Sequence, residues 1–328
     1  MKEISIHEIE NIRIGSAENK EAGTGCTVIV LENGAPAGLD VRGGGPASRE
    51  SELLKPLAHA DKIHAVLLSG GSAFGLDAAG GVMQYLEEHG IGFPVGEIRV
   101  PLVCESCIFD LGIGDGRVRP DKAMGYAACE NAFGGRNGNY RDGNLGAGTG
   151  ASVGKVCGAA FAMKAGIGSY AVQVGPLKVG AIVAVNAIGD IYDWKSGRKV
   201  AGLLGEDKKS FRPSEEVLLQ MYESALQKNA QPESRLVENT TIGIVITNAR
   251  FDKAQLCKIA GMTHNGYARS IRPVHTSMDG DSIYAVSVGD VPADKDLVGT
   301  LAAEVMSEAI LRAVDVEAAY GLLSARNL

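Results

Sequence analysis

The chain has 328 residues, of which 45% are hydrophobic and 22% are charged. This balance is typical of a folded globular protein and excludes a disordered one. A formal net charge of -7 provides no basic footprint, so we expect no nucleic-acid partner.

We expect neither a targeting signal nor a cofactor. Residues 1–13 contain several acidic side chains and lack the apolar stretch of a signal peptide. No run of eighteen or more apolar residues occurs in the sequence, so we expect no membrane-spanning helix and a cytoplasmic location. Cys104 and Cys107 have the spacing of metal ligands, but no second ligand pair accompanies them. We therefore expect no metal site and six reduced cysteines.

Apolar runs separated by glycine-rich turns predict the elements of the first half. Strands are expected at residues 26–32, 37–41, 63–69, 99–103 and 107–111. Asn33-Gly34 indicates a hairpin that pairs the first two strands. Ser72 is expected to cap a helix that continues to about residue 88, and a second helix is expected at 120–131.

Apolar strands and helices also alternate in the second half. Strands are expected at residues 168–174, 179–186, 240–247 and 283–288. Helices are expected at residues 213–229, 253–271 and 294–323. Residues 231–234 (QPES) are expected to form a polar linker. The pattern favours a layered α/β protein in which helices cover the sheets.

The start of one predicted strand is suited to self-cleavage. In residues 239–249 (NTTIGIVITNA), Thr240 opens the strand directly after Asn239. A hydroxyl at this place can attack the preceding peptide carbonyl, and hydrolysis then leaves Thr240 as a new N-terminus. Its free α-amino group, with a reference pKa of about 7.7–8.0, can take the hydroxyl proton. The alternative is that Asn-Thr simply opens a strand after a turn.

Two other segments contain groups that can stabilise an oxyanion. Gly70, Gly71 and Ser72 lie at an expected strand-to-helix turn, where backbone N–H groups favour developing negative charge. Asn186 ends an apolar strand, where its side-chain amide can donate to a tetrahedral intermediate. The alternative for both segments is a turn that requires small or polar residues.

Charged residues provide further candidates. Asp279 and Asp281 flank a glycine before a strand and can orient the hydroxyl and amino groups of a nucleophile; the alternative is a polar turn. Lys164 is a single cation between an apolar stretch and a turn, and by itself it is typical of a surface lysine. Residues 149–156 (TGASVGKV) are similar to a phosphate-binding loop but lack its first glycine and its magnesium-binding hydroxyl, so we expect no nucleotide.

Segments spread over nearly the whole chain, in the same order, resemble the L-aminopeptidase/D-esterase family, which includes β-peptidyl aminopeptidases and nylon-oligomer hydrolases. They are GCTVIVLENGAPAGLDVRGGGPASRE, LSGGSAFGLDAAGGVMQYLEEHGIGFPVG, RPDKAMGYAAC, GAGTGASVGK, VAVNAIGD, ENTTIGIVITNA and RPVHTSMDGDSIYAVSVG. The resemblance implies an α/β fold, a four-layer αββα sandwich of the N-terminal nucleophile type. It also implies a single domain, residues 1–328, that cuts itself into an α chain (1–239) and a β chain (240–328).

The resemblance also implies the site residues. The nylon-hydrolase branch uses a threonine nucleophile, which matches Thr240, and two aspartates, which match Asp279 and Asp281. Its lysine and asparagine resemble Lys164 and Asn186. The aminopeptidase branch uses a serine nucleophile supported by a Ser-x-Glu pair, so Ser277 is a secondary candidate.

The expected function is that of a self-processing amidohydrolase or aminopeptidase acting on small peptides or amides. Tyr140, in the glycine-rich loop at residues 134–143, is a candidate substrate contact. The resemblance implies a homo-oligomer, a tetramer of αβ units, and no membrane partner. One alternative is an acyl transferase of the ornithine acetyltransferase type with an N-terminal threonine nucleophile. Another is a non-catalytic binding protein on the same fold.

Overall fold

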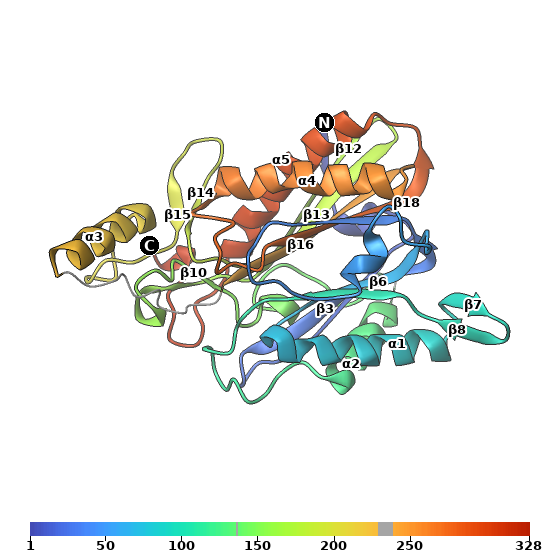
Figure 1. The fold of residues 1–328 in the computed structure, drawn as a ribbon, viewed down its shortest axis with the longest axis horizontal. Helices are drawn as coiled ribbons and strands as arrows, with labels where there is room; N and C mark the ends of the chain where they lie inside the picture. Colours follow the sequence, from blue (N-terminus) through green and yellow to red (C-terminus); the bar gives the residue numbers. More distant parts are fainter. Residues whose placement is uncertain (136, 229–238) are drawn as a thin grey trace.

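The computed structural model describes residues 1–135, 137–228 and 239–328. Two β-sheets pack face to face, and a pair of helices covers the outer face of each sheet (Figure 1). This is the four-layer αββα sandwich that the family resemblance implies. The linker expected at residues 231–234 lies outside the described residues.

The six-stranded sheet contains the strand that begins with Thr240. Its strand order is β1 (Lys2–Ile4), β12 (Ile167–Val174), β13 (Leu177–Asn186), β16 (Thr240–Ala249), β18 (Ser282–Val291) and β4 (Ala37–Val41). β16 runs antiparallel to β13 and parallel to β18. It therefore occupies an interior position, with a hydrogen-bonded neighbour on each side.

The second sheet has five strands, in the order β2 (Arg13–Asn19), β3 (Thr24–Ala35), β6 (Ile63–Ser69), β9 (Val103–Cys107) and β5 (Ala47–Arg49). Three smaller sheets are also described. Two are pairs: β7 (Phe93–Val95) with β8 (Ile98–Val100), and β10 (Ser152–Val153) with β11 (Met163–Lys164). In the third, β14 (Asp190–Tyr192) lies between β15 (Lys199–Ala201) and β17 (Ile271–Arg272).

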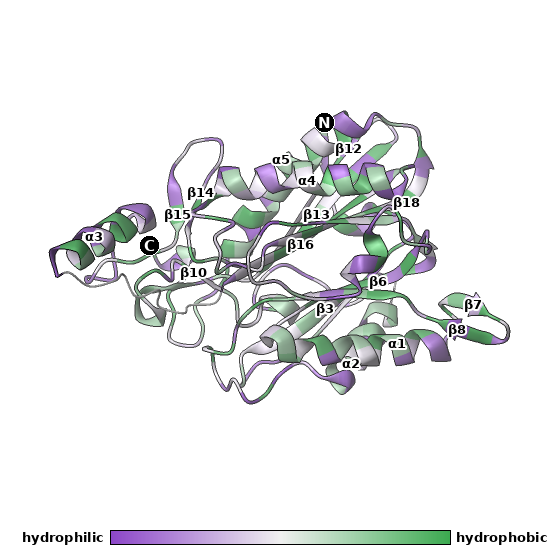
Figure 2. Ribbon diagram, in the orientation of Figure 1, coloured by the Kyte–Doolittle hydropathy of each residue, from purple (hydrophilic) through white to green (hydrophobic). Residues whose placement is uncertain are grey.

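The helices divide between the two sheets. α4 (Lys253–Ser270) and α5 (Lys295–Val314) pack on the six-stranded sheet, whereas α1 (Ala78–Glu88) and α2 (Lys122–Phe133) pack on the five-stranded sheet. α3 (Ser214–Gln227) extends away from the sandwich and carries both hydrophobic and hydrophilic residues (Figure 2). Its exposed apolar side chains include Leu219 and Leu226. Among the described helices, none combines the length and apolar character that a membrane span requires.

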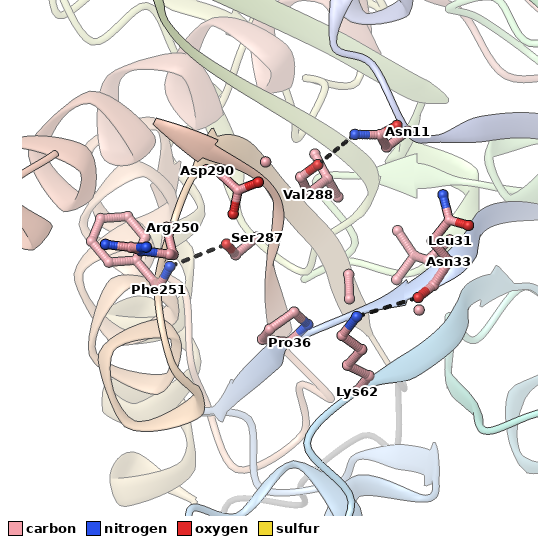
Figure 3. A pocket seen from close by; sticks show the side chains of 13 residues that line it. Asn11, Leu31, Asn33, Pro36, Lys62, Arg250, Phe251, Ser287, Val288 and Asp290 are labelled. Carbon is pink, nitrogen blue, oxygen red and sulfur yellow. Dashed lines mark hydrogen bonds between the residues drawn. The ribbon is translucent and has the colours of Figure 1, made fainter. Parts of the chain in front are cut away.

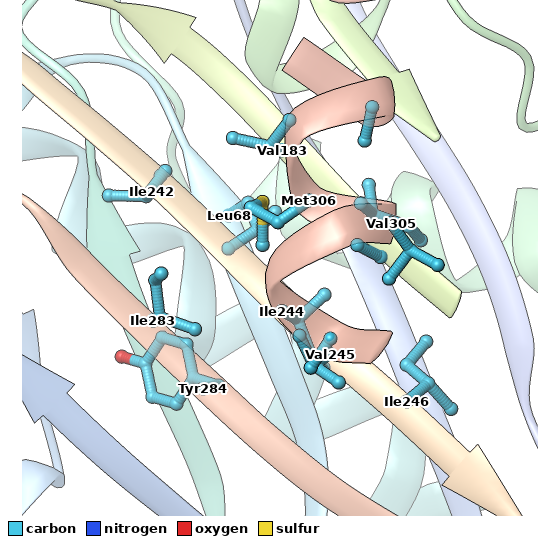
Figure 4. Packing of buried hydrophobic residues seen from close by; sticks show 14 of the residues in the cluster. Leu68, Val183, Ile242, Ile244, Val245, Ile246, Ile283, Tyr284, Val305 and Met306 are labelled. Atoms are coloured by element: carbon cyan, nitrogen blue, oxygen red, sulfur yellow. The ribbon is translucent and has the colours of Figure 1, made fainter. Parts of the chain in front are cut away.

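The hydrophobic core explains the continuous apolar sequence of β16. Ile242, Ile244, Val245 and Ile246 are all fully buried, although successive side chains point to opposite faces of the sheet. Figure 4 shows these side chains between α5 and the residues of the facing sheet, including Leu68. Because both faces of the strand are covered, its sequence does not alternate between apolar and polar residues.

Most of the strands predicted from apolar runs are confirmed, but the predicted hairpin at Asn33-Gly34 is wrong. β3 continues through both residues to Ala35, and β4 then joins the other sheet, where it pairs with β18. The extended segment predicted at 107–111 is also displaced, since β9 ends at Cys107. The turn motif marks a change of sheet here, because burial of Ala37 against β18 outweighs the local turn preference.

Two helix boundaries also differ from the prediction. Ser72 does not cap α1: it has a φ of +53° and begins a 3-10 turn (Ser72–Asp77), and α1 starts at Ala78. α5 ends at Val314, so the helix predicted to reach residue 323 is nine residues shorter (323 - 314 = 9) at its C-terminal end. The periodic alanine spacing of α5 does not extend into the final segment of the chain.

Glycines on the strands allow the covering helices to approach closely. A Cβ added at Gly168 on β12 would lie 2.3 Å from the carbonyl oxygen of Ala309 and 2.4 Å from the amide nitrogen of Ala313. A Cβ at Gly15 on β2 would lie equally close to the backbone of α2. The contact atoms belong to helix backbone, so they cannot move aside as a flexible side chain would.

We expect Gly168→Ala to lower the free energy of unfolding by about 1–3 kcal/mol, because the added methyl group must push α5 away from the sheet. Chemical denaturation measures the change. Gly112→Ala is the matched control, because a Cβ at Gly112 meets no atom within 4 Å. Equal stability of the two variants would contradict this account of helix packing.

Candidate active site

Thr240 and Asn186 lie side by side at one end of the six-stranded sheet. Thr240 is the first residue of β16, Asn186 is the last residue of β13, and their Cα atoms are direct partners in the antiparallel ladder. Asn186 is fully buried and Thr240 is 5% exposed. The register of these strands therefore places the two sequence-predicted residues together.

The peptide bond before Thr240 is held by the turn that contains Asp279. The Thr240 hydroxyl donates to the carbonyl oxygen of Asn239 at 2.5 Å. The Gly280 N–H donates to the same carbonyl oxygen at 2.9 Å, and the Asn239 N–H donates to the carbonyl oxygen of Met278 at 3.3 Å. The Thr240 hydroxyl thus lies against the carbonyl group of the preceding residue, and a backbone N–H polarises that group.

Both predicted carboxylates belong to this site. Asp281 accepts the Thr241 N–H at 2.7 Å through one carboxylate oxygen. Asp279 accepts the Thr276 N–H at 2.7 Å, which stabilises the turn. Burial, with a further contribution from the neighbouring charge of Asp281, raises the pKa of Asp279 to about 6.

Lys155 was not among the site residues predicted from the sequence, yet it bonds Asn186. Its ammonium group donates to the side-chain oxygen of Asn186 at 2.8 Å and to the backbone oxygen of Asn186 at 3.2 Å. Burial lowers the pKa of Lys155 to about 7, although the charges of Asp279, Asp110 and Asp281 act to raise it. Lys155 therefore connects Asn186 electrostatically with the carboxylates.

Lys164, the lysine singled out from the sequence, has different neighbours. Its ammonium group donates to the backbone oxygens of Gly148 at 3.1 Å, Ala151 at 2.9 Å and also Ala165. Burial lowers its pKa to about 7, and the opposing charge is that of Asp110. Both lysines are buried, but of the two only Lys155 bonds Asn186 among the described contacts. One feature of the sequence could have indicated Lys155: it ends GAGTGASVGK, one of the segments that resemble the family.

The side chain of Asn186 is oriented by three contacts. Its amide nitrogen donates to the carbonyl oxygen of Phe109 at 2.8 Å. Its side-chain oxygen accepts the Ser152 N–H at 3.2 Å as well as the Lys155 ammonium group. An asparagine amide has two N–H groups, so one remains to donate to an oxyanion.

The backbone N–H groups proposed as oxyanion donors at Gly70, Gly71 and Ser72 are engaged inside the protein. They donate respectively to the carbonyl oxygen of Gly25 at 2.8 Å, to a carboxylate oxygen of Asp110 at 2.7 Å, and to the carbonyl oxygen of Ile108 at 2.9 Å. In this structure these three hydrogen bonds stabilise the turn. Gly71 anchors Asp110, whose charge acts on both buried lysines.

Two candidates remain, Tyr140 and Ser277. Neither has a described hydrogen bond to Thr240. Tyr140 is buried, and its hydroxyl donates to Asp142 at 3.0 Å. Asp142 also accepts a hydrogen bond from the Ser169 hydroxyl. Ser169 pairs with Ile182 of β13, which lies four residues before Asn186 (186 - 182 = 4), or about 13 Å along the strand. Ser277 is exposed in the same turn as Asp279.

A cavity of about 310 Å³ at the other end of β16 is remote from this cluster (Figure 3). It is lined by Arg250 and Phe251, which follow β16, and by Ser287 and Asp290 of β18. Since β16 has ten residues, roughly 33 Å separates the cavity from Thr240. Within the described part of the chain, no group of three His, Cys, Asp or Glu side chains has an arrangement that could hold a metal ion.

Comparison with known proteins agrees with this architecture. The family model described as peptidase family S58 matches residues 5–322. An uncharacterized aminopeptidase of Mycobacterium leprae is 38% identical over 303 residues, which cover 88% of this chain and 80% of the relative. The 6-aminohexanoate-oligomer endohydrolase of Paenarthrobacter ureafaciens is 31% identical over 328 aligned residues, which cover 95% of this chain and 86% of the relative.

Solved structures share the fold at lower sequence identity. The L-aminopeptidase D-Ala-esterase/amidase of Ochrobactrum anthropi, described as a variant of the Ntn hydrolase fold, has a TM-score of 0.68 at 17% identity, covering 94% of this chain and 85% of that chain. The β-aminopeptidase of a Burkholderia species has a TM-score of 0.64 at 19% identity, covering 94% and 86%. The chain belongs to peptidase family S58 and is a peptide or amide hydrolase with the N-terminal nucleophile fold.

Proposed function

We propose that this chain is a self-processing amidase whose nucleophile is Thr240. The observation that carries the proposal is the contact between the Thr240 hydroxyl and the carbonyl oxygen of Asn239, which also accepts the Gly280 N–H. Two buried carboxylates, those of Asp279 and Asp281, lie in the same site. The family membership supports the same reading.

The first step is an N-to-O acyl shift. The Thr240 oxygen bonds to the carbonyl carbon of Asn239, the bond from that carbon to the Thr240 nitrogen breaks, and an ester forms. Neutral Lys155 accepts the hydroxyl proton and then gives it to the leaving nitrogen, which becomes the free amino group of Thr240. Water then hydrolyses the ester, which leaves a carboxylate on Asn239 and restores the Thr240 hydroxyl.

Lys155 suits the role of this base for two reasons. Its pKa of about 7 leaves a substantial neutral fraction at neutral pH. Its hydrogen bonds to Asn186 fix it beside the residue that pairs with Thr240. Lys164, whose ammonium group is surrounded by backbone oxygens, has a structural role in this proposal.

After cleavage, the Thr240 amino group is the general base for substrate hydrolysis. General-base catalysis contributes typically about 10²–10⁴-fold. The Gly280 N–H, which holds the Asn239 carbonyl before cleavage, and the second N–H of Asn186 hold the oxyanion of the substrate. An acyl-enzyme on Thr240 forms first and is then hydrolysed.

The substrate class follows from the relatives and from one apolar cluster. Val156, Ile188, Leu203 and Val217 form a small hydrophobic cluster, against which Met278 packs. Since the half-buried Met278 adjoins Asp279, an apolar side chain lies next to the site. Together with the names of the relatives, this supports linear amides with apolar segments, such as small peptides and ω-amino acid oligomers, as substrates. The tetramer of αβ units also remains a proposal, which light scattering of the cleaved protein tests.

We expect the purified chain to give two bands on denaturing electrophoresis, with the smaller one starting Thr-Thr-Ile-Gly. Thr240→Ala should stay intact, because it lacks the attacking hydroxyl. Thr241→Val is the matched control: it removes the neighbouring hydroxyl, which has no hydrogen-bond partner in the described structure, and it should cleave normally. N-terminal sequencing decides the result, and an intact wild-type chain would favour the binding-protein alternative.

We expect Lys155→Met to slow self-cleavage by about 100-fold or more, because the proton acceptor is lost. In the wild type, the cleavage rate should rise as the pH passes about 7, since deprotonation makes the amine an acceptor. Lys164→Met is the comparison, and it should keep both the cleavage and the rise with pH.

Circular dichroism of both lysine variants, made on the Thr240→Ala background, tests whether they fold. The opposite pattern, with folded Lys164→Met inert and Lys155→Met active, would assign the base to Lys164.

A further inference from the structure

Asp281 is held by a histidine that has no part in the proposed chemistry. One oxygen of the Asp281 carboxylate accepts the Thr241 N–H at 2.7 Å. The other oxygen accepts two donors from His275, the backbone N–H at 3.1 Å and the ring Nδ1–H at 2.9 Å. The carboxylate is 1% exposed, so these three N–H groups replace its hydration.

The backbone of His275 adopts an unusual conformation that makes this double contact. Its φ is +59°, in the left-handed region that residues with a Cβ rarely occupy. This conformation directs the backbone N–H and the ring of one residue to the same carboxylate oxygen. Such conformations occur preferentially at functional sites, where surrounding contacts maintain them.

Neighbouring rings hold the imidazole in place. The His275 ring lies 4.7 Å from that of His264, nearly perpendicular to it, and 6.0 Å from that of Tyr267. Both neighbours come from α4 and are buried. Burial lowers the pKa of His264 to about 4, so His264 is neutral near pH 7 and adds no positive charge beside His275.

Among the described residues, two carboxylates contact His275 and His264. Asp281 faces His275 directly, and His264 contacts Asp40 of β4, whose carboxylate oxygen is 3.3 Å from the His264 Nε2. Arg42 bonds Asp40 at 2.9 Å and lies beyond it. Among the described contacts, Asp281 is therefore the carboxylate that the His275 ring bonds.

We propose that His275 is a positioning residue for Asp281: it holds the carboxylate directed at the Thr241 N–H, so that the start of β16 stays aligned for attack. This inference rests on the proposed role of Thr240. His275 touches neither the scissile bond nor the hydroxyl in a described contact, and it acts through Asp281.

Two substitutions at the same position separate the ring from the backbone. His275→Asn keeps a side-chain N–H donor and tolerates a positive φ, whereas His275→Gly relaxes the backbone and removes the donor. A hydrogen bond to a charged group is strong enough that its loss in His275→Gly should slow self-cleavage about tenfold. His275→Asn, which keeps the donor, should cleave at close to the wild-type rate.

His89→Gly is the matched control, because His89 ends α1 on the outer side of the other sheet. It should cleave at the wild-type rate. Wild-type cleavage by His275→Gly, or a His275→Asn variant as slow as His275→Gly, would overturn the proposal. Melting temperatures on the Thr240→Ala background test whether the variants fold.

A second measurement does not depend on cleavage. In the intact Thr240→Ala chain, nitrogen-15 NMR should show His275 with its proton on Nδ1, and Asp281→Asn should alter that signal. A proton on Nε2 would overturn the contact itself. If the wild type failed to cleave but the Nδ1 proton were present, the proposed function would fail while the His275–Asp281 contact stood.

Discussion

The structure around Thr240 depends on one constraint, the burial of the first peptide groups of an interior strand. β16 has strands on both sides and is covered on both faces, so the backbone N–H and C=O groups at its start need partners inside the protein. Asp281 satisfies the Thr241 N–H, and Gly280 satisfies the Asn239 carbonyl. The same contacts that allow the strand to be buried also place a polarised carbonyl beside a hydroxyl.

Charge burial is the second feature that shapes the site. Lys155 and Lys164 are buried together with Asp110 and Asp279, and no group can be removed without leaving an opposite charge less compensated. Burial lowers the pKa of both lysines and raises the pKa of Asp279 and Asp110. These groups therefore change protonation closer to neutral pH than in water, which is the range in which they can exchange protons.

The two sheets contribute different parts of the site. Asn186 ends β13, Thr240 begins β16 and Asp281 directly precedes β18 in the six-stranded sheet. Phe109 and Asp110 instead follow β9 of the five-stranded sheet. Phe109 orients Asn186 through its carbonyl oxygen, and Gly71 anchors Asp110 through its amide. The site is complete only when the sheets pack together, so its geometry depends on the core between them.

The sequence by itself determined the elements whose signal is local. Continuous apolar runs located the buried strands and placed Thr240, Asn186, Asp279 and Asp281 at or beside strand ends. There each also had a purely structural interpretation, and the family resemblance implied their catalytic roles. Only the tertiary structure shows that Lys155 bonds Asn186 whereas Lys164 bonds backbone oxygens, because both are single lysines in glycine-rich surroundings. It also decided the contact of His275 with Asp281, because a left-handed backbone and the rings of α4, distant in sequence, direct that side chain. The physical reason is that burial and hydrogen-bond partners come from segments that are far apart along the chain.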